Sequence, residues 1–299
     1  MLSIQHVSKH YAGKTALNKV SLEVREGSVF GLLGPNGAGK TSLIRIITLI
    51  TAPDEGEILF QGQPITRDLI TRIGYLPEER GLYRKMEVIE QALYFAKLKG
   101  LSTQEAKTRV KDWFQRLDMW SWRGKKVEEL SKGMQQKLQF VLTVIHNPKL
   151  IILDEPFTGF DPVNAEVIKQ EILHLKEQGS TVILSTHRME SVEELCDDIA
   201  LINKSEVVLS GEVEEVRHRY KKNEFEVIYE GEALEAIEGG TVLHTTTLKN
   251  GQHRSMLSSQ TESPKQMLHG LIDQREVHAF KELIPSIKDI FIEIVGGSI

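Results

Sequence analysis

The strongest constraint on the fold lies in the stretch GLLGPNGAGKTSLIRIIT. Gly34, Gly37 and Gly39 fall within six positions and are followed at once by Lys40 and Thr41. Glycine carries an entropic cost in any ordered segment, so a cluster this dense indicates a backbone shape that side chains would block. The spacing matches G-x-x-x-x-G-K-[ST], which predicts a loop whose backbone N–H groups surround phosphate oxygens. The apolar run before it and the helical pattern after it supply the strand–loop–helix context that this motif requires.

Length, charge and hydropathy narrow the class of protein. A chain of 299 residues favours two domains over one. The net charge of −5 argues against a general nucleic-acid binder, so no nucleic-acid partner is expected. The most apolar window, LIRIITLITA, contains Arg45 and is too short for a membrane span, which needs roughly 20 apolar residues. Any membrane role is therefore expected to act through a partner. Cys196 is the only cysteine and is interpreted as a buried structural thiol.

Strand and helix patterns alternate through the first two thirds of the chain. Alternating or apolar runs predict strands at LSIQHVSKHY, SVFGLLG, KLIILDEP, TVILST and IALIN, with helices between the later ones. This order predicts an α/β sheet covered on both faces. Between about residues 86 and 146 the pattern is helical, with Ser102 as a predicted helix cap. Trp113, Trp120 and Trp122 are expected to anchor this helical region.

A different pattern follows the Lys-rich turn RYKKNE, which is the predicted domain boundary. Its segments are interpreted as strand, helix, strand, strand, helix, strand and helix, with the first helix at ALEAIEGG. The β-α-β-β-α-β order predicts a small ferredoxin-like α+β domain. The expected domains are residues 1–212 and 213–299.

Carboxylates and a histidine follow two of the apolar strands. Asp154 and Glu155 end LIILDEP, and the carboxyl ends of strands are where open α/β sheets bind ligands. Such a pair alone is usually an ordinary strand end. Together with the glycine loop, it predicts Asp154 as a Mg²⁺ ligand through water, with Thr41, and Glu155 as a general base. His187 follows the next strand and is expected to contact the γ-phosphate, although a lone histidine is more often structural.

The stretch ELSKGMQQKLQ contains a motif that resembles the signature of a known family. LSKGM resembles the LSGGQ signature of ATP-binding cassette (ABC) ATPases, GPNGAGKT resembles Walker A, LIILDE resembles Walker B, and GFDP resembles the D-loop. The resemblance covers about residues 2–212 and implies a P-loop NTPase cassette with a helical subdomain that uses ATP and Mg²⁺. It implies catalytic roles for Lys40, Glu155 and His187, with Tyr11 stacking on adenine. The nucleotide contacts it implies are Tyr11, Gly34, Pro35, Asn36, Gly37, Ala38, Gly39, Lys40, Thr41, Ser42, Glu78, Ser131, Gly133 and Asp161.

In this family two cassettes face each other head to tail, and the signature of one closes the ATP site of the other. Ser131 at a predicted helix N-terminus, with the Gly133 N–H beside it, forms an anion site of its own. The chain already has one such site at Gly34, so the second is expected to act in trans. The resemblance therefore implies a homodimer or a pair of related cassettes.

Two positions depart from the family pattern. Glu78 stands where the family usually has Gln, and it is a candidate Mg²⁺ ligand that also adds negative charge near the γ-phosphate. Lys132 stands where the signature usually has Gly, and Met134 where it usually has Gln. One hypothesis is that Lys132 of one protomer offsets Glu78 of the other around a shared phosphate. The alternative is that Lys132 is simply solvated.

The stretch LPEERGLYRKMEV and the tail PSIKDIFIEIVGG resemble the ATPase subunits of sodium-efflux and drug-efflux systems with separate permeases. The resemblance implies an integral-membrane permease as partner, export as the direction of transport, and a place at the cytoplasmic face of the membrane. Arg80, Tyr83 and Arg84 are candidate permease contacts, with a plain surface loop as the alternative. A cassette ATPase with a non-transport regulatory role is the competing function. Ribosome-acting and DNA-repair cassettes fit less well, because the chain has one cassette, net acidity and no long coiled coil.

Overall fold

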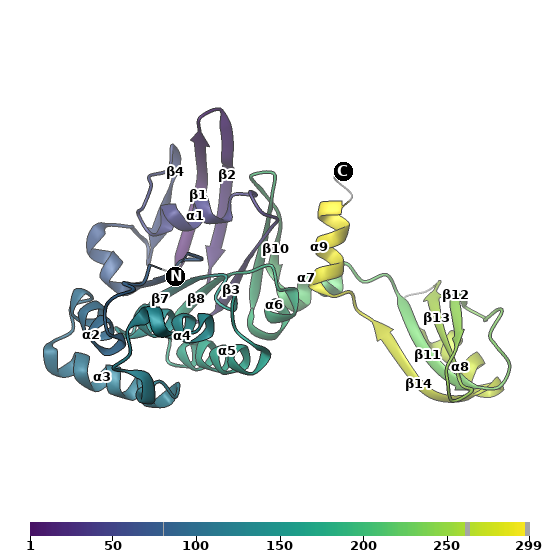
Figure 1. The fold of residues 1–299 in the computed structure, drawn as a ribbon. Coiled ribbons are helices and arrows are strands. Elements are labelled where there is room, and N and C mark those ends of the chain that lie inside the picture. The colour runs from purple at the N-terminus through teal and green to yellow at the C-terminus, as the bar shows by residue number, and fades with distance from the viewer. Residues whose placement is uncertain (80, 261–263, 297–299) are drawn as a thin grey trace. The chain divides into compact units, whose positions relative to one another are not determined.

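The computed structural model describes residues 1–79, 81–260 and 264–296. It divides into two compact units, Met1–Val213 with two sheets and Glu214–Ile299 with one, and each unit has its own core (Figure 1). The predicted permease contact at Arg80 lies outside the described residues.

A four-stranded antiparallel sheet forms one layer of the first unit. Its strand order is β2-β1-β4-β5, and its strands are β1 (Leu2–Tyr11), β2 (Lys14–Val24), β4 (Glu55–Phe60) and β5 (Gln63–Pro64). From Val20 to Val24 alternate residues of β2 are buried, as expected for a sheet with one solvated face.

A six-stranded sheet with the order β10-β9-β3-β8-β7-β6 forms the centre of this unit. Its strands are β3 (Val29–Leu33), β6 (Ile73–Leu76), β7 (Leu150–Asp154), β8 (Thr181–Ser185), β9 (Asp198–Asn203) and β10 (Glu206–Glu212). All strands but β10 run parallel, and every residue of β3, β7 and β8 is buried. The continuous apolar runs of the sequence are therefore strands covered on both faces.

Helices cover both faces of the central sheet (Figure 1). Helix α1 (Lys40–Ile47) packs its apolar side between the two sheets, where Leu43, Ile44 and Ile47 join the main core. Helices α4 (Lys132–Val144), α5 (Pro162–Glu177) and α6 (Met189–Leu195) complete the layers. Cys196 is buried at the end of α6, as predicted, and burial raises the pKa of its thiol.

The helical region contains α2 (Val88–Leu98), α3 (Thr103–Arg116) and short 3-10 turns, and it packs against α4. Ser102 caps α3 as predicted: the Glu105 N–H donates to its Oγ at 3.3 Å, and the Ser102 N–H donates to the Glu105 carboxylate at 3.0 Å. Trp113 and Trp122 are buried and Trp120 is half-buried, which agrees with their predicted anchoring role.

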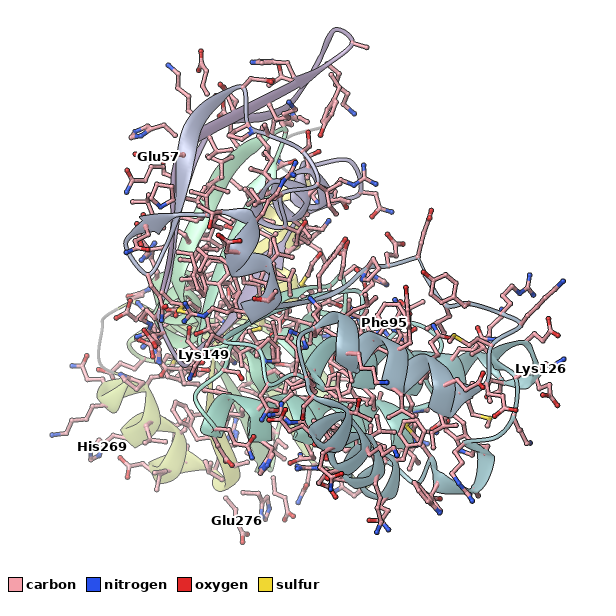
Figure 2. All side chains as sticks on the ribbon, turned by 90° about the vertical axis from the view of Figure 1, so that its left-hand side faces the viewer. Glu57, Phe95, Lys126, Lys149, His269 and Glu276 are labelled. Atoms are coloured by element: carbon pink, nitrogen blue, oxygen red, sulfur yellow. The ribbon has the colours of Figure 1, made fainter. Side chains whose placement is uncertain are left out.

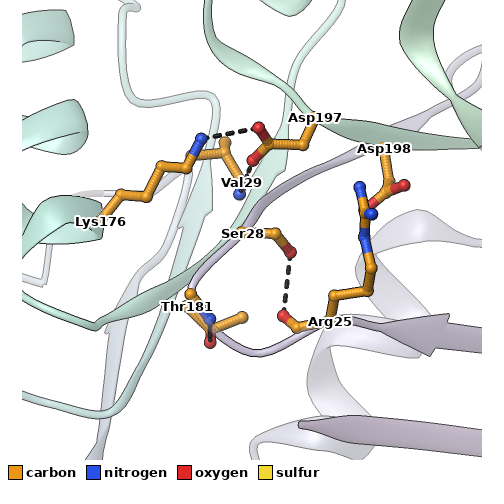
Figure 3. A network of polar contacts seen from close by, with 8 residues as sticks. Arg25, Ser28, Val29, Lys176, Thr181, Asp197 and Asp198 are labelled. Carbon is orange, nitrogen blue, oxygen red and sulfur yellow. Dashed lines mark hydrogen bonds and ion pairs between the residues drawn. The ribbon is translucent and has the colours of Figure 1, made fainter.

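A polar network ties the amino-terminal ends of the central strands together (Figure 3). The Asp197 carboxylate accepts from the Val29 N–H at 2.8 Å and from Lys176 Nζ at 2.6 Å, which joins β3, α5 and the start of β9. Arg25 Nε donates to Asp198 at 2.7 Å in the same region. The network fixes the sheet at the edge opposite the glycine loop.

The second unit is a four-stranded antiparallel sheet with the order β12-β13-β11-β14. It contains β11 (Glu224–Glu230), β12 (Gly240–Thr247), β13 (His253–Ser259), α8 (Lys265–Gln274), β14 (Glu276–Leu283) and α9 (Ile287–Gly296), and α7 (Val213–Arg219) precedes it. The strand order is that of a ferredoxin-like fold, and Phe225, Val227 and Leu257 lie in its core.

The helix predicted at ALEAIEGG is absent, and this prediction is wrong. Residues 231–239 form an irregular connection between β11 and the parallel-running β12, and a helical crossover needs roughly a dozen residues or more. The buried Tyr229 hydroxyl holds the connection instead, because it accepts the Leu234 N–H at 2.8 Å.

Candidate functional site

The glycine loop joins β3 to α1, and its backbone explains the glycines. Gly34 has φ +148°, and a Cβ there would lie 2.2 Å from the Ile202 carbonyl oxygen. Gly39 has φ +121°, and a Cβ there would lie 2.3 Å from the Ala16 carbonyl oxygen. Both positions therefore exclude side chains for two independent reasons, the backbone conformation and the close approach of another strand.

The loop ends at the N-terminus of α1, which carries no side-chain cap and no acidic residue in its first turn. Its first N–H groups and the helix dipole therefore favour an anion at this point. Lys40 lies beside them, and its Nζ donates to the carbonyls of Gly34 at 2.6 Å and Pro35 at 3.1 Å. Burial lowers the pKa of Lys40, while the nearby carboxylates of Glu155, Asp154 and Glu78 act in the opposite direction.

A cavity of about 430 Å³ lies at the carboxyl edge of the central sheet, beside the loop. It is polar and open on one side, and it brings together residues that are far apart in the sequence. Its lining includes Tyr11, Asn36, Gly37, Gly39, Lys40, Thr41, Ser42, Glu78, Asp154, Glu155 and His187, all predicted, together with Lys14, Ala16, Thr158 and Ser185.

Asp154 is the most buried carboxylate of the cavity. Burial raises its pKa, the charges of Glu78 and Glu155 raise it further, and the Ser185 hydroxyl and Lys40 lower it. A buried acid beside two other carboxylates is expected to bind a cation readily, because the cation removes the repulsion.

Glu155 follows directly and has an unusual backbone conformation, with φ +52°. Its N–H donates to the Ser185 carbonyl at 2.8 Å. Its Oε1 accepts from the backbone N–H of His187 at 3.0 Å and lies 2.7 Å from the His187 Nδ1, whereas its Oε2 lies 3.4 Å from the Thr186 hydroxyl. Two of the three residues predicted to be catalytic, Glu155 and His187, are thus in direct contact.

Comparison with known proteins gives this site its family. A family model described as "ABC transporter" matches residues 17–158, and one described as "ATP-binding protein DrrA1-3-like, C-terminal domain" matches residues 211–295. The chain is 40% identical over 300 residues to the uncharacterized ABC transporter ATP-binding protein YhaQ of Bacillus subtilis, and the match covers 99% of each chain. This chain belongs to the ATP-binding proteins of ABC transporters. It is an ABC ATPase, as the sequence predicted.

Two further relatives of this ABC ATPase extend the comparison. The Nod factor export ATP-binding protein I of Sinorhizobium fredii is 30% identical, and the match covers 99% of this chain and 86% of that protein. A solved structure titled "Structure of ATP binding subunit of ABC transporter" superposes with a TM-score of 0.69 at 27% identity, and it covers 74% of this chain and 93% of that one. The predicted cassette fold is confirmed.

Some predicted nucleotide contacts of the ABC ATPase lie outside the cavity. Ser131 caps α4, where its Oγ accepts the Met134 N–H at 3.2 Å, and Gly133 adjoins Gly159 and Phe160 rather than Lys40. Asp161 caps α5 and accepts the Asn164 N–H at 2.9 Å. Gly34 shapes the loop from outside the cavity lining, and Pro35 and Ala38 line a neighbouring hollow.

Four cavity residues of the ABC ATPase were not predicted: Lys14, Ala16, Thr158 and Ser185. Lys14 and Ala16 follow Tyr11 closely at the β1–β2 turn. Because Tyr11 was predicted to contact the adenine, these two residues could have been expected near the same site. Ser185 ends the strand before His187, and only the strand order places it beside Asp154.

The residues of the cavity fit a magnesium–nucleotide complex. Thr41, Asp154 and Glu78, the three predicted metal ligands, all line it and offer the oxygen donors that Mg²⁺ prefers. In the part of the chain that the structure describes, no group of three His, Cys, Asp or Glu side chains could hold a metal. Mg²⁺ is usually held by one or two carboxylates together with substrate phosphates, and this donor set fits that manner of binding. No helix among the described residues is long and apolar enough to cross a membrane.

Proposed function

We propose that this ABC ATPase hydrolyses Mg-ATP as one half of a head-to-tail pair of cassettes and thereby drives a separate membrane permease in export. One observation carries the proposal. Ser131 and Gly133 lie at the N-terminus of α4, outside the cavity that Lys40, Asp154 and Glu155 line, and the helix N–H groups there would favour a second anion. If the signature of a second copy faced this cavity, one triphosphate would contact the glycine loop of one copy and the Ser131 site of the other.

Each residue at the carboxyl edge of the central sheet would have a separate role in binding or hydrolysing the nucleotide. Lys40 supplies positive charge for phosphate oxygens, Tyr11 stacks on the adenine, and Thr41, Asp154 and Glu78 hold the cation. Magnesium, when bound, neutralises phosphate charge that would otherwise oppose attack. Glu155 is the general base, and its Oε2 is the less engaged oxygen, because Oε2 accepts only the long bond from the Thr186 hydroxyl at 3.4 Å whereas Oε1 accepts from the backbone N–H of His187 and lies beside its Nδ1.

His187 would position this base and contact the γ-phosphate. Its Nδ1 lies within hydrogen-bond distance of Glu155, and its side chain is 69% exposed towards the cavity mouth. Donation to Glu155 and to a phosphate oxygen at the same time requires the protonated imidazolium, because the neutral ring has one donor only. The histidine would thus link the base to the charge of the nucleotide.

A hollow of about 360 Å³ is the proposed permease contact, and it supports the predicted role of the loop after Glu78. It is mostly apolar, and Tyr75, Leu82 and Phe95 line it. The rings of Tyr83 and Tyr94 lie 6.0 and 5.7 Å from the Phe95 ring, and both tyrosines are exposed. Figure 2 shows Phe95 on α2, in the helical region. An exposed aromatic group of this kind is suited to bind a short amphipathic helix of a partner. It therefore favours a permease contact over the alternative that this segment is a plain surface loop.

Export is the direction that the relatives support, since one of them, the Nod factor export ATP-binding protein I at 30% identity, is named for export. The proposal places the cassette at the cytoplasmic face of the membrane, bound through the permease. Residues 1–212 would form the cassette, with a helical subdomain at about residues 86–146, and residues 213–299 an accessory domain.

The decisive experiment is Glu155→Gln. This variant should bind ATP, fail to hydrolyse it and accumulate as a dimer, measured by light scattering after gel filtration with Mg-ATP. Glu177→Gln, at an exposed end of α5, is the control and should behave as the parent protein. Normal hydrolysis by Glu155→Gln would refute the assignment of the base, and a monomer loaded with ATP would refute the paired arrangement. Failure of the protein to co-purify with any membrane protein would favour the regulatory alternative.

A further inference from the structure

Ser185 occupies a central place in the cavity that its sequence position does not reveal. It is the last residue of β8, the strand between β3 of the glycine loop and β7 of Asp154 (Figure 1). It pairs with Leu32 on one side and with Asp154 on the other. Residues paired in this register project to the same face of a parallel sheet, and both Ser185 and Asp154 line the cavity.

The hydroxyl of Ser185 is fully buried, and its Oγ has no hydrogen-bond partner among the residues that the structure describes. The neighbouring buried hydroxyls are paired: the Thr181 Oγ1 accepts the Gly27 N–H at 2.9 Å, and the Thr186 Oγ1 accepts the Arg188 N–H at 3.1 Å. An unpaired buried hydroxyl is costly, so its presence calls for an explanation.

We propose that Ser185 is a positioning residue for the cation site: its hydroxyl donates a hydrogen bond to the Asp154 carboxylate when a divalent cation and nucleotide occupy the cavity. The bond orients this carboxylate towards the cation. The backbone carbonyl of Ser185 meanwhile holds the Glu155 N–H at 2.8 Å, so one residue sets the positions of both acids. The Ser185 hydroxyl already lies near enough to the Asp154 carboxylate to lower its pKa, although its Oγ does not meet the geometry of a hydrogen bond with any described residue. The inference rests on the proposed nucleotide site.

The test separates cation binding from nucleotide binding. A fluorescent, non-cleavable ATP analogue is titrated into the full-length protein, first with EDTA and then with increasing Mg²⁺ or Mn²⁺. Ser185→Ala should weaken the apparent cation affinity by about 10–100-fold, as loss of groups that orient metal ligands does. The affinity for the analogue in EDTA should not change. Ser185→Thr, which keeps the hydroxyl, should restore most of the cation affinity.

Thr181→Ala is the matched control, because it removes a buried hydroxyl from the same strand at the end away from the cavity. It should lower the melting temperature but leave the cation affinity as in the parent protein. If Ser185→Ala does not fold, Ser185→Cys, with a weak donor of similar size, should show the same direction of change. Equal cation affinity in the parent and the alanine or cysteine variant, or equal losses with and without cation, would overturn the inference. Absence of nucleotide binding by the parent protein would instead refute the proposed function.

Discussion

His146 offers a sharp test of the electrostatics of the first unit. It lies between α4 and β7 along the chain, and both of its ring nitrogens are buried, with a backbone group of Ile73 nearby that acts to raise its pKa. Burial, with the nearby positive charges of Lys99 and Arg109, lowers the pKa of His146 to about 4. The ring should therefore stay neutral in the folded protein at pH values where it binds a proton in the unfolded chain.

The magnitude follows from this pKa. Between about pH 6.5 and pH 4 the unfolded state binds more protons than the folded state, so stability falls as the pH is lowered through this window. A folded pKa of about 4 against an ordinary value of 6.5 amounts to a loss of about 2 kcal/mol between pH 8 and pH 5. Above about pH 6.5 the His146 ring is neutral in both states, so this loss of stability is absent there.

The assay is urea unfolding at a series of pH values, followed by tryptophan fluorescence, because Trp113, Trp120 and Trp122 all lie in the first unit. His146→Gln should flatten the dependence on pH by this amount, whatever its effect on stability at pH 8. Other titrating groups cancel in the difference between the two proteins. Parallel curves for the parent and the variant, or titration of the His146 ring near pH 6.5 by NMR, would refute the reasoning.

Three further predictions concern the nucleotide site and the proposed permease contact. Lys132→Glu should lower the ATPase rate about tenfold by adding charge near the phosphates, and Glu78→Lys in the same chain should restore part of it; no rescue would remove the hypothesis of a charge pair between protomers. Gly39→Ala should weaken ATP binding by at least about tenfold in a binding titration, since its conformation costs a side chain ~1–2 kcal/mol before the clash with Ala16. Gly62→Ala, which also has a positive φ but no close neighbour, should bind ATP normally. Tyr83→Ala should reduce stimulation of ATPase activity by the permease while leaving the basal rate unchanged, and equal stimulation would argue for a plain surface loop.

Residues that belong to local patterns could be predicted from the sequence. The apolar run of β7 predicts a buried strand, and Asp154 therefore falls at its carboxyl edge, in the cavity. Ser102 could be predicted as a cap because its partner Glu105 lies three residues away. The loop at Gly34 carries its own strand and helix on either side, so the motif and its context appear together in the sequence.

Residues whose place depends on strand order could not be predicted in this way. Ser185 adjoins Asp154 because β8 lies between β3 and β7, and no spacing in the sequence states that order. The false helix at ALEAIEGG has the composition of a helix, but the distance between β11 and β12 along the chain is too short for one. The short length of chain between β11 and β12 leaves no room for the helix that the local composition favours.

The hydrogen bonds from Lys40 to the carbonyls of Gly34 and Pro35 have a consequence for the kinetics of nucleotide exchange. These two bonds hold the loop in shape, so an incoming phosphate binds to a loop that is already ordered. The phosphate has only to replace the two carbonyl oxygens as hydrogen-bond partner of the Lys40 ammonium group. Nucleotide binding would then require little rearrangement of the main chain. After the product nucleotide dissociates, the same lysine would again hold the loop.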